Sequence, residues 1–259
     1  MKLKKYWEVF IFSLKSQINF WADYLFSLLS FGIFIFIFNH LWEYILAGKS
    51  VVGYTKSELI WYIIISELIV CSIPKIYKKI SDKIKTGDIA VLLTKPISMI
   101  DYYFAENLTC FLKVGIYFIF GILIGWFWAG PIDINGIQIS LFAVSLIIAM
   151  ISQILLQLLV GVIAFFTEEN KAFNLIFQKL SFLLVFTPLE FYPEIFQKIL
   201  LCFPTTYIYY VPAKIFSNHP KLTLSLELLG MEILMMIILW VLVHAIYAKG
   251  VKKINVNGG

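Results

Sequence analysis

The chain has 259 residues, of which 61% are hydrophobic and only 14% charged, whereas soluble domains carry about 25% charged residues. This composition indicates an integral membrane protein and excludes an ordinary soluble domain. The net charge of +5 rests on lysine, because the sequence contains no arginine. Without a guanidinium group the chain has neither an arginine finger nor a bidentate phosphate clamp. We attribute the positive charge to membrane topology and expect no nucleic-acid partner.

The chain begins with an amphipathic stretch within residues 1–19. Trp7, Phe10 and Leu14 share one helical stripe there, while lysines lie away from it, which predicts an interfacial helix on the inner leaflet. Six apolar stretches of about membrane length follow, since a helix needs about 20 residues to cross 30 Å of hydrocarbon. We therefore expect an all-α integral membrane protein in which residues 1–259 form a single transmembrane domain. The expected spans are 22–41, 57–74, 101–128, 136–166, 173–189 and 222–247.

A lysine-dense cytosolic segment, residues 75–98, separates the second and third spans. Ile76, Ile80 and Ile84 recur in it at helical spacing, so one face requires apolar cover while the other stays in water. A lysine in hydrocarbon costs about 3 kcal/mol or more, which keeps the segment outside the membrane. Two interpretations stay open at this point: a docking surface for a cytosolic protein, or an ordinary loop with the positive charge typical of the inner side.

Residues 190–221, between the fifth and sixth spans, hold four prolines and many aromatic residues. We expect a broken, partly re-entrant helix pair on the outer side, because irregular backbone at membrane depth survives only against protein or water. Lysine counting sets the orientation: with the N-terminus inside, fifteen lysines lie in cytosolic segments and five in outer ones. We therefore expect a multi-pass protein of a bacterial plasma membrane with both termini in the cytosol.

Motifs for catalysis are missing from the sequence. There is no G-x-x-x-x-G-K-[ST] phosphate loop and no H-E-x-x-H zinc motif, and the three cysteines lack metal-ligand spacing. Glu168 and Glu169 lie together at a membrane edge, but no arginine follows them as it does in intramembrane proteases of the CAAX type. We expect no enzyme, cofactor or metal site in this chain.

Acidic residues within or beside the spans are candidates for function, because an ionised carboxylate in hydrocarbon is costly unless it is paired, protonated or wetted. Glu232 lies most firmly within a span, and Glu67 either lines a polar cavity or bonds to a neighbouring helix. An ion-coupled secondary transporter that uses Glu67 or Glu232 is therefore an alternative function. We attribute Gln153 and Gln157, one helical turn apart, to helix packing. The acids considered are Glu67, Glu106, Glu227 and Glu232.

Three features occur in a distinctive order along the chain. Residues 84–96 read Ile-Lys-Thr-Gly-Asp-Ile-Ala-Val-Leu-Leu-Thr-Lys-Pro, residues 166–170 read Phe-Thr-Glu-Glu-Asn before the fifth span, and a series of prolines follows that span. With the amphipathic start and the six spans, these features resemble the permease subunits of type-2 ATP-binding-cassette (ABC) exporters of ABCG-like architecture. The prolines of the series are Pro188, Pro193, Pro204 and Pro212.

The resemblance implies that residues 77–90 form a coupling helix that seats in a cytosolic ABC ATPase dimer. That partner, and not this chain, would bind ATP and magnesium. The resemblance also implies a second permease, identical or paralogous, packed face to face with this one, and an outer lid made by residues 190–221. The residues we expect to couple to the ATPase are Tyr77, Ile80, Lys83, Ile84, Lys85, Gly87 and Asp88.

The resemblance further implies a pathway lined by the second and fifth spans. An aromatic, mostly apolar lining suits an amphipathic cargo such as a drug, a lipid or a peptide-like molecule, which an exporter would move outward. The pathway residues that we select by helical spacing are Trp61, Ser66, Glu67, Val70, Phe173, Phe177, Leu180 and Leu184.

Overall fold

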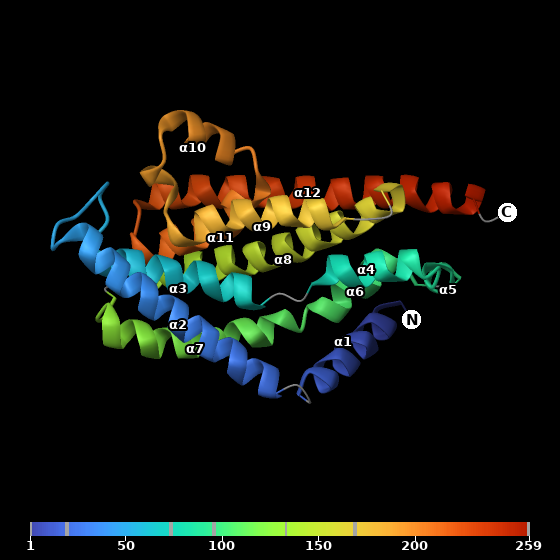
Figure 1. The fold of residues 1–259 in the computed structure, drawn as a ribbon, viewed down its shortest axis with the longest axis horizontal. Coiled ribbons are helices and arrows are strands. Elements are labelled where there is room, and N and C mark those ends of the chain that lie inside the picture. Colours follow the sequence, from blue (N-terminus) through green and yellow to red (C-terminus); the bar gives the residue numbers. More distant parts are fainter. Residues whose placement is uncertain are drawn as a thin grey trace.

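The computed structural model describes residues 2–18, 21–72, 75–94, 97–132, 134–167 and 170–257 (Figure 1). Every regular element in these ranges is a helix, apart from an isolated antiparallel bridge between Val51 and Tyr54. The helices are α1 (Lys2–Ile18), α2 (Trp21–Leu46), α3 (Lys56–Ser72), α4 (Ile76–Lys85), α5 (Ile89–Leu93), α6 (Met99–Asn107), α7 (Cys110–Trp128), α8 (Gly136–Thr167), α9 (Lys171–Phe186), the short 3₁₀ helix η1 (Leu189–Phe191), α10 (Glu194–Leu200), α11 (Pro204–Ser217) and α12 (Leu222–Asn257).

Among the described residues, five helical stretches are long and apolar enough to cross a membrane, or six if a bent pair counts as one span. The bent pair is α10 and α11, which meet at 108° as expected of a broken segment. The span expected at 173–189 is shorter than a crossing helix, because α9 has 16 residues and is therefore about 24 Å long. Pro188 explains its end, since the residue before a proline is driven out of the helical conformation; Thr187 is extended. The long apolar stretches are Asp23–Leu46, α3 taken together with α4, α6 taken together with α7, Gly136–Thr167 and Leu222–Lys253; residues 73 and 74, between α3 and α4, are outside the described residues.

The two ends of the helical bundle differ in what they contain. Figure 1 shows α4, α5, the start of α1 and the end of α12 together at one end of the long axis. The opposite end carries α10 and the connection that follows α2. We call these the tip end and the far end. The expected boundaries at residues 19 and 74 fall outside the described residues.

The third expected span is interrupted, since α6 ends at Asn107 and α7 begins at Cys110. The Asn107 amide donates to the Tyr103 carbonyl over 2.7 Å, and the Thr109 hydroxyl donates to the Glu106 carbonyl over 3.1 Å. Short polar side chains that bond to nearby carbonyls in this way compete with the helical hydrogen bonds. They account for a break that hydropathy alone does not predict.

The core of the bundle is built from α3, α8 and α11. Most side chains of α3 and nearly all of those of α11 are buried, and α8 contacts α4, α11 and α12. Close packing of α7 on α3 depends on glycine: a Cβ on Gly121 would lie 2.7 Å from Ile64, and one on Gly125 would collide with the Trp61 ring. Small residues four apart let two helices approach closely. The apolar outer faces of α2, α7 and α12 stay exposed, as lipid-facing surfaces do.

Candidate functional site

The tip end of the bundle presents a helical hairpin formed by α4 and α5. Gly87 joins the two helices with a φ of +79°, a left-handed conformation that glycine adopts without strain. The last turn of α4 is closed by the amide of Thr86, which donates to the Asp82 carbonyl over 3.0 Å. The Thr86 hydroxyl donates to Asp88 Oδ2 over 2.8 Å. The sequence Thr-Gly-Asp therefore fixes the turn at the tip.

The apolar face of α4 is covered by the chain itself. Ile76 and Ile80 are fully buried, and Gly161 of α8 accommodates Ile80, because a Cβ there would lie 2.7 Å from Ile80 Cδ1. The buried amide of Asn170 donates to the carbonyls of Tyr77 and Val160, both over 3.1 Å. This amide joins the backbone of α4 to that of α8.

The residues expected to couple to an ATPase lie in three environments. Lys85, Gly87 and Asp88 are exposed at the tip. Ile80 has no exposed surface, so it anchors α4 to α8 and does not offer a contact to another protein; the expectation that it does is corrected here. Its helical spacing showed that an apolar face exists, but not that α8 covers it. The partly buried residues of the set are Tyr77, Lys83 and Ile84.

A surface residue that the sequence reasoning missed lies on α5. Val91 is 61% exposed, although it sits within the apolar run Ile89–Leu93. Ile89, two positions before Val91, is buried. Residues two apart lie on different sides of a helix, so the spacing could have indicated that Val91 is exposed. Lys95 and Pro96 of the same segment lie outside the described residues, as do Glu168 and Glu169.

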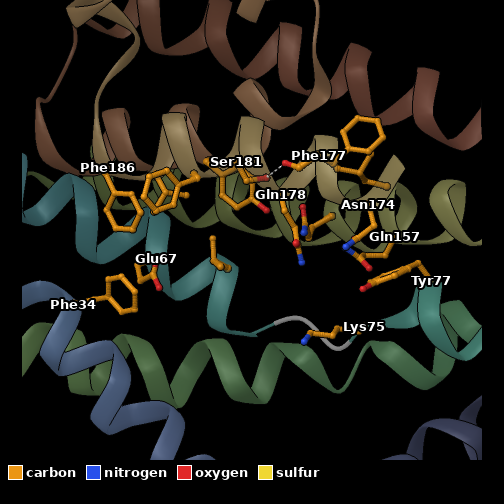
Figure 2. Close-up of a pocket in the computed structure, with 16 residues that line it drawn as sticks. Phe34, Glu67, Lys75, Tyr77, Gln157, Asn174, Phe177, Gln178, Ser181 and Phe186 are labelled. Carbon is orange, nitrogen blue, oxygen red and sulfur yellow. Dashed lines mark hydrogen bonds between the residues drawn. The ribbon is translucent and has the colours of Figure 1, made fainter. Parts of the chain in front are cut away.

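A cavity of about 320 Å³ opens beside α4, enclosed by side chains from α2, α3, α8, α9 and α11 (Figure 2). Its volume falls at the lower end of the range for small-molecule sites. Figure 2 shows Phe34, Phe186 and Glu67 toward one end, and Lys75, Tyr77 and Asn174 toward the other. Because Tyr77 belongs to α4, the helix that ends at the tip also forms part of this cavity.

Polar groups in the cavity wall are short of partners. Glu67 is only 6% exposed, and its Oε1 accepts a hydrogen bond from the Cys71 thiol at 3.4 Å. Among the described residues, no basic side chain lies within ion-pair distance of Glu67. The buried Oε1 atoms of Gln153 and Gln157 have no hydrogen-bond partner. We attributed these two glutamines to helix packing, whereas the structure places both in the cavity wall.

One face of α9 supplies much of the cavity. Its lining residues recur every three or four positions, as residues on one face, or stripe, of a helix do. They include amide, hydroxyl and phenyl side chains and one valine. Phe186, at the far end of this stripe, stacks on Phe38 of α2 with ring centroids 4.2 Å apart. The polar members of the stripe were absent from our expected pathway, although their spacing was a usable signal. The stripe consists of Asn174, Phe177, Gln178, Ser181, Phe182, Val185 and Phe186.

Three of the eight expected pathway residues, Glu67, Val70 and Phe177, line the cavity. Trp61 is buried against α7, and Ser66 is fully buried and donates to the Val185 carbonyl over 2.7 Å. These two side chains therefore hold helices together within the chain. The others that the cavity does not include are Leu184, whose carbonyl accepts a 2.6 Å bond from Tyr62, the partly buried Leu180 and the exposed Phe173.

The other acidic candidates lie elsewhere in the fold. Glu232 of α12 is fully buried, and its Oε2 accepts a 2.7 Å hydrogen bond from Ser145 of α8; it does not line the cavity. Glu106 forms a 3.0 Å ion pair with Lys79 that links α6 to α4. Glu227 is exposed on the outer face of α12. Glu67 is thus the acidic residue of this set that meets the cavity.

A polar cluster closes the far end of the bundle. Glu190 of η1 forms an ion pair with Lys214 of α11 and accepts hydrogen bonds from Tyr210, over 2.6 Å, and Tyr54, over 3.2 Å. Burial raises the pKa of Tyr54, so its hydroxyl keeps the proton that it donates. The cluster ties the connection after α2 to η1 and α11, and the sequence reasoning did not identify it.

The family comparison covers nearly the whole chain. A family model described as "ABC-2 family transporter protein" matches residues 24–258. No match is found among curated proteins. The matched range includes the cavity, the α4–α5 tip and the far-end cluster.

Proposed function

Because the chain belongs to the ABC-2 transporter family and is thus an ABC permease subunit, we propose that it forms the export pathway of a transporter whose separate ATPase docks on the α4–α5 tip. The observation that carries this proposal is the position of α4. This helix ends at the exposed residues Lys85, Gly87 and Asp88 and contributes Tyr77 to the cavity. A force applied at the tip therefore acts on an element that forms the cavity wall.

Contacts along α4 support its motion as a unit with the bundle. Ile80 is held against Gly161, Asn170 bonds to the backbone of both α4 and α8, and Lys79 pairs with Glu106 of α6. Packed helices shift as rigid bodies between discrete arrangements. Nucleotide-driven movement of a docked ATPase would thereby reach α6 and α8 together, which changes the spacing of the helices around the cavity.

The remaining parts of the proposal concern orientation and assembly. The tip end is cytosolic in this scheme, since most lysines lie in segments assigned to that side, and both termini share that end in a bacterial plasma membrane. Two permeases face each other across the pathway, and α10, which leads into the buried helix α11, covers its outer exit. The cargo is amphipathic, because phenyl groups and amides alternate in the cavity wall.

The docking assignment is tested by charge reversal at the tip. We expect Asp88→Lys, and separately Val91→Glu, to prevent copurification of the ATPase that accompanies the unaltered chain. Glu194→Lys is the matched control, since Glu194 is an exposed carboxylate on α10 at the far end. Retention of the ATPase by both tip variants would refute the docking site, and its loss in Glu194→Lys as well would show that the effect is not local.

An ion-coupled transporter stays the second candidate because Glu67 lies in the cavity without an ionic partner among the described residues. The two candidates differ in their energy source. Liposomes that contain the chain and its ATPase should accumulate cargo only with ATP, whereas a proton gradient should suffice for the chain alone if the second candidate holds.

A further inference from the structure

We propose that the cavity selects amphiphiles that carry a protonated amine, with Glu67 as the charged partner of the amine and glutamine carbonyls of α8 as neutral acceptors. This inference rests on the proposed function in one respect: it treats the cavity as the place where cargo binds. It adds a chemical class to that cargo. Three features of the described cavity wall support it: the balance between donors and acceptors, the phenyl groups and the position of Lys75.

The described cavity wall has unused acceptors. Glu67 is only 6% exposed, yet it accepts a hydrogen bond from the Cys71 thiol, which is a weak donor. Gln153 is equally buried, and its Oε1 has no partner. A buried acceptor without a donor is unfavourable, so a ligand that supplies donors gains at each of these oxygens. An ammonium group has three donors and no acceptor, which matches this wall.

The apolar part of the wall suits the body of such a molecule. Phe34 of α2 faces Phe186 of α9 in a stacked arrangement with ring centroids 5.9 Å apart, and Phe177 and Phe182 add two further rings to the lining. Figure 2 shows Glu67 at the same end of the cavity as Phe34 and Phe186. Aromatic rings accept a cation over their faces as well as an apolar chain. The carboxylate and the rings can therefore act on one amine-bearing molecule.

The position of Lys75 argues against an anionic cargo. Lys75 is the basic residue among those that line the cavity, and it is exposed. Figure 2 places it toward the opposite end from Glu67. An exposed ammonium attracts anions weakly because water screens it. The buried Glu67 carboxyl group ionises most readily beside a cation, so it favours a positive group and offers no attraction to an anion. The buried end of the cavity is thus suited to a positive group.

A matched series of probes tests the inference on the complete chain in nanodiscs of zwitterionic lipid, with empty nanodiscs as the blank. The series is 4-phenylbutylamine, 4-phenylbutan-1-ol and 5-phenylpentanoate, which share the phenylbutyl body and differ in the head group. At neutral pH we expect the amine to bind at least tenfold more tightly than the alcohol, about 1.4 kcal/mol, and the acid to bind most weakly. Equal binding of amine and alcohol, or tightest binding of the acid, would overturn the proposal.

Variants assign the preference to the named side chains. Glu67→Gln should reduce amine binding at least tenfold and leave alcohol binding unchanged, and Gln157→Leu should weaken the amine more than the alcohol. Glu227→Gln, which removes the same charge from an exposed position, should change neither. An unchanged amine preference in Glu67→Gln contradicts the assignment. If that variant fails to fold, the ranking of the three probes on the unaltered chain still decides the proposal.

The binding assay contains neither ATPase nor ATP, so it is independent of the assembly and transport assays. Amine preference without ATPase docking would refute only the proposed function. Docking and ATP-dependent transport without amine preference would refute only the present inference.

Discussion

Gly161→Ala should loosen the attachment of α4 to the bundle. The added Cβ would lie 2.7 Å from Ile80 Cδ1, about 0.8 Å inside the shortest favourable separation of two carbons. Overpacking of this kind costs about 1–3 kcal/mol. The alanine also stabilises the helix by about 0.5–1 kcal/mol relative to glycine, so we expect a net loss of roughly 0–2.5 kcal/mol in the free energy of unfolding.

A control isolates the steric part of that effect. A Cβ on Gly230, within α12, would meet no atom within 4 Å, so Gly230→Ala should show the helical gain without the clash. The two alanine variants should therefore differ by about 1–3 kcal/mol. Unfolding of the purified chain in mixed micelles, followed by tryptophan fluorescence, measures this difference.

A second substitution should relieve the clash. Ile80→Val removes Cδ1 and costs about 0.5–1.5 kcal/mol by itself, but it leaves the nearest remaining Ile80 atom 3.3 Å from the new Cβ. The double variant should thus be more stable than the sum of the single effects by about 1 kcal/mol or more. Equal stability of Gly161→Ala and Gly230→Ala, or strict additivity in the double variant, would refute the packing argument.

The far end of the bundle yields two further predictions, each read out by the same unfolding measurement. Lys214→Met should lower the free energy of unfolding by about 3 kcal/mol, because it leaves the Glu190 carboxylate without its cation. The double variant Lys214→Met/Glu190→Gln should recover part of that loss. A double variant less stable than the single one would contradict this prediction. Thr55→Ala should cost about 1 kcal/mol, since Thr55 and Glu58 form a reciprocal cap at the start of α3, with the Thr55 amide donating to Glu58 Oε2 over 2.7 Å. Thr55→Ser should retain the cap, and an equal loss in that variant would show that the hydroxyl is not responsible.

Hydropathy predicted the bounds of a helix well where that helix is continuous through the bundle. The stretch 136–166 corresponds to α8, because an uncharged apolar run of that length has few alternatives. It was less informative at 101–128, where the side chains of Asn107 and Thr109 bond back to carbonyls of α6 at the break between α6 and α7. Hydropathy scales average over such side-chain bonds and so cannot register them.

The candidate site shows a different limit. Spacing predicts that Ile80 belongs to an apolar face and that Glu67 is out of place in hydrocarbon, but it does not say what lies opposite either residue. That information depends on α8, which brings Gly161 against Ile80 and Gln153 into the cavity wall. The far-end cluster has the same origin, since Glu190 and Lys214 meet only once α11 has folded back. Contacts between distant segments therefore account for most of what the sequence did not reveal.

The inward face of α4 and the tip that follows it are under different structural constraints. Its inward isoleucines must retain their shape, because a glycine on α8 leaves room for one particular side chain. At the tip, Gly87 and the bond between Thr86 and Asp88 are needed for the turn, whereas Ala90 and Val91 are exposed and fill no fitted space. The exposed tip positions can therefore be substituted to suit a different ATPase, or exchanged between related permeases in a chimera, while the rest of the bundle keeps its architecture.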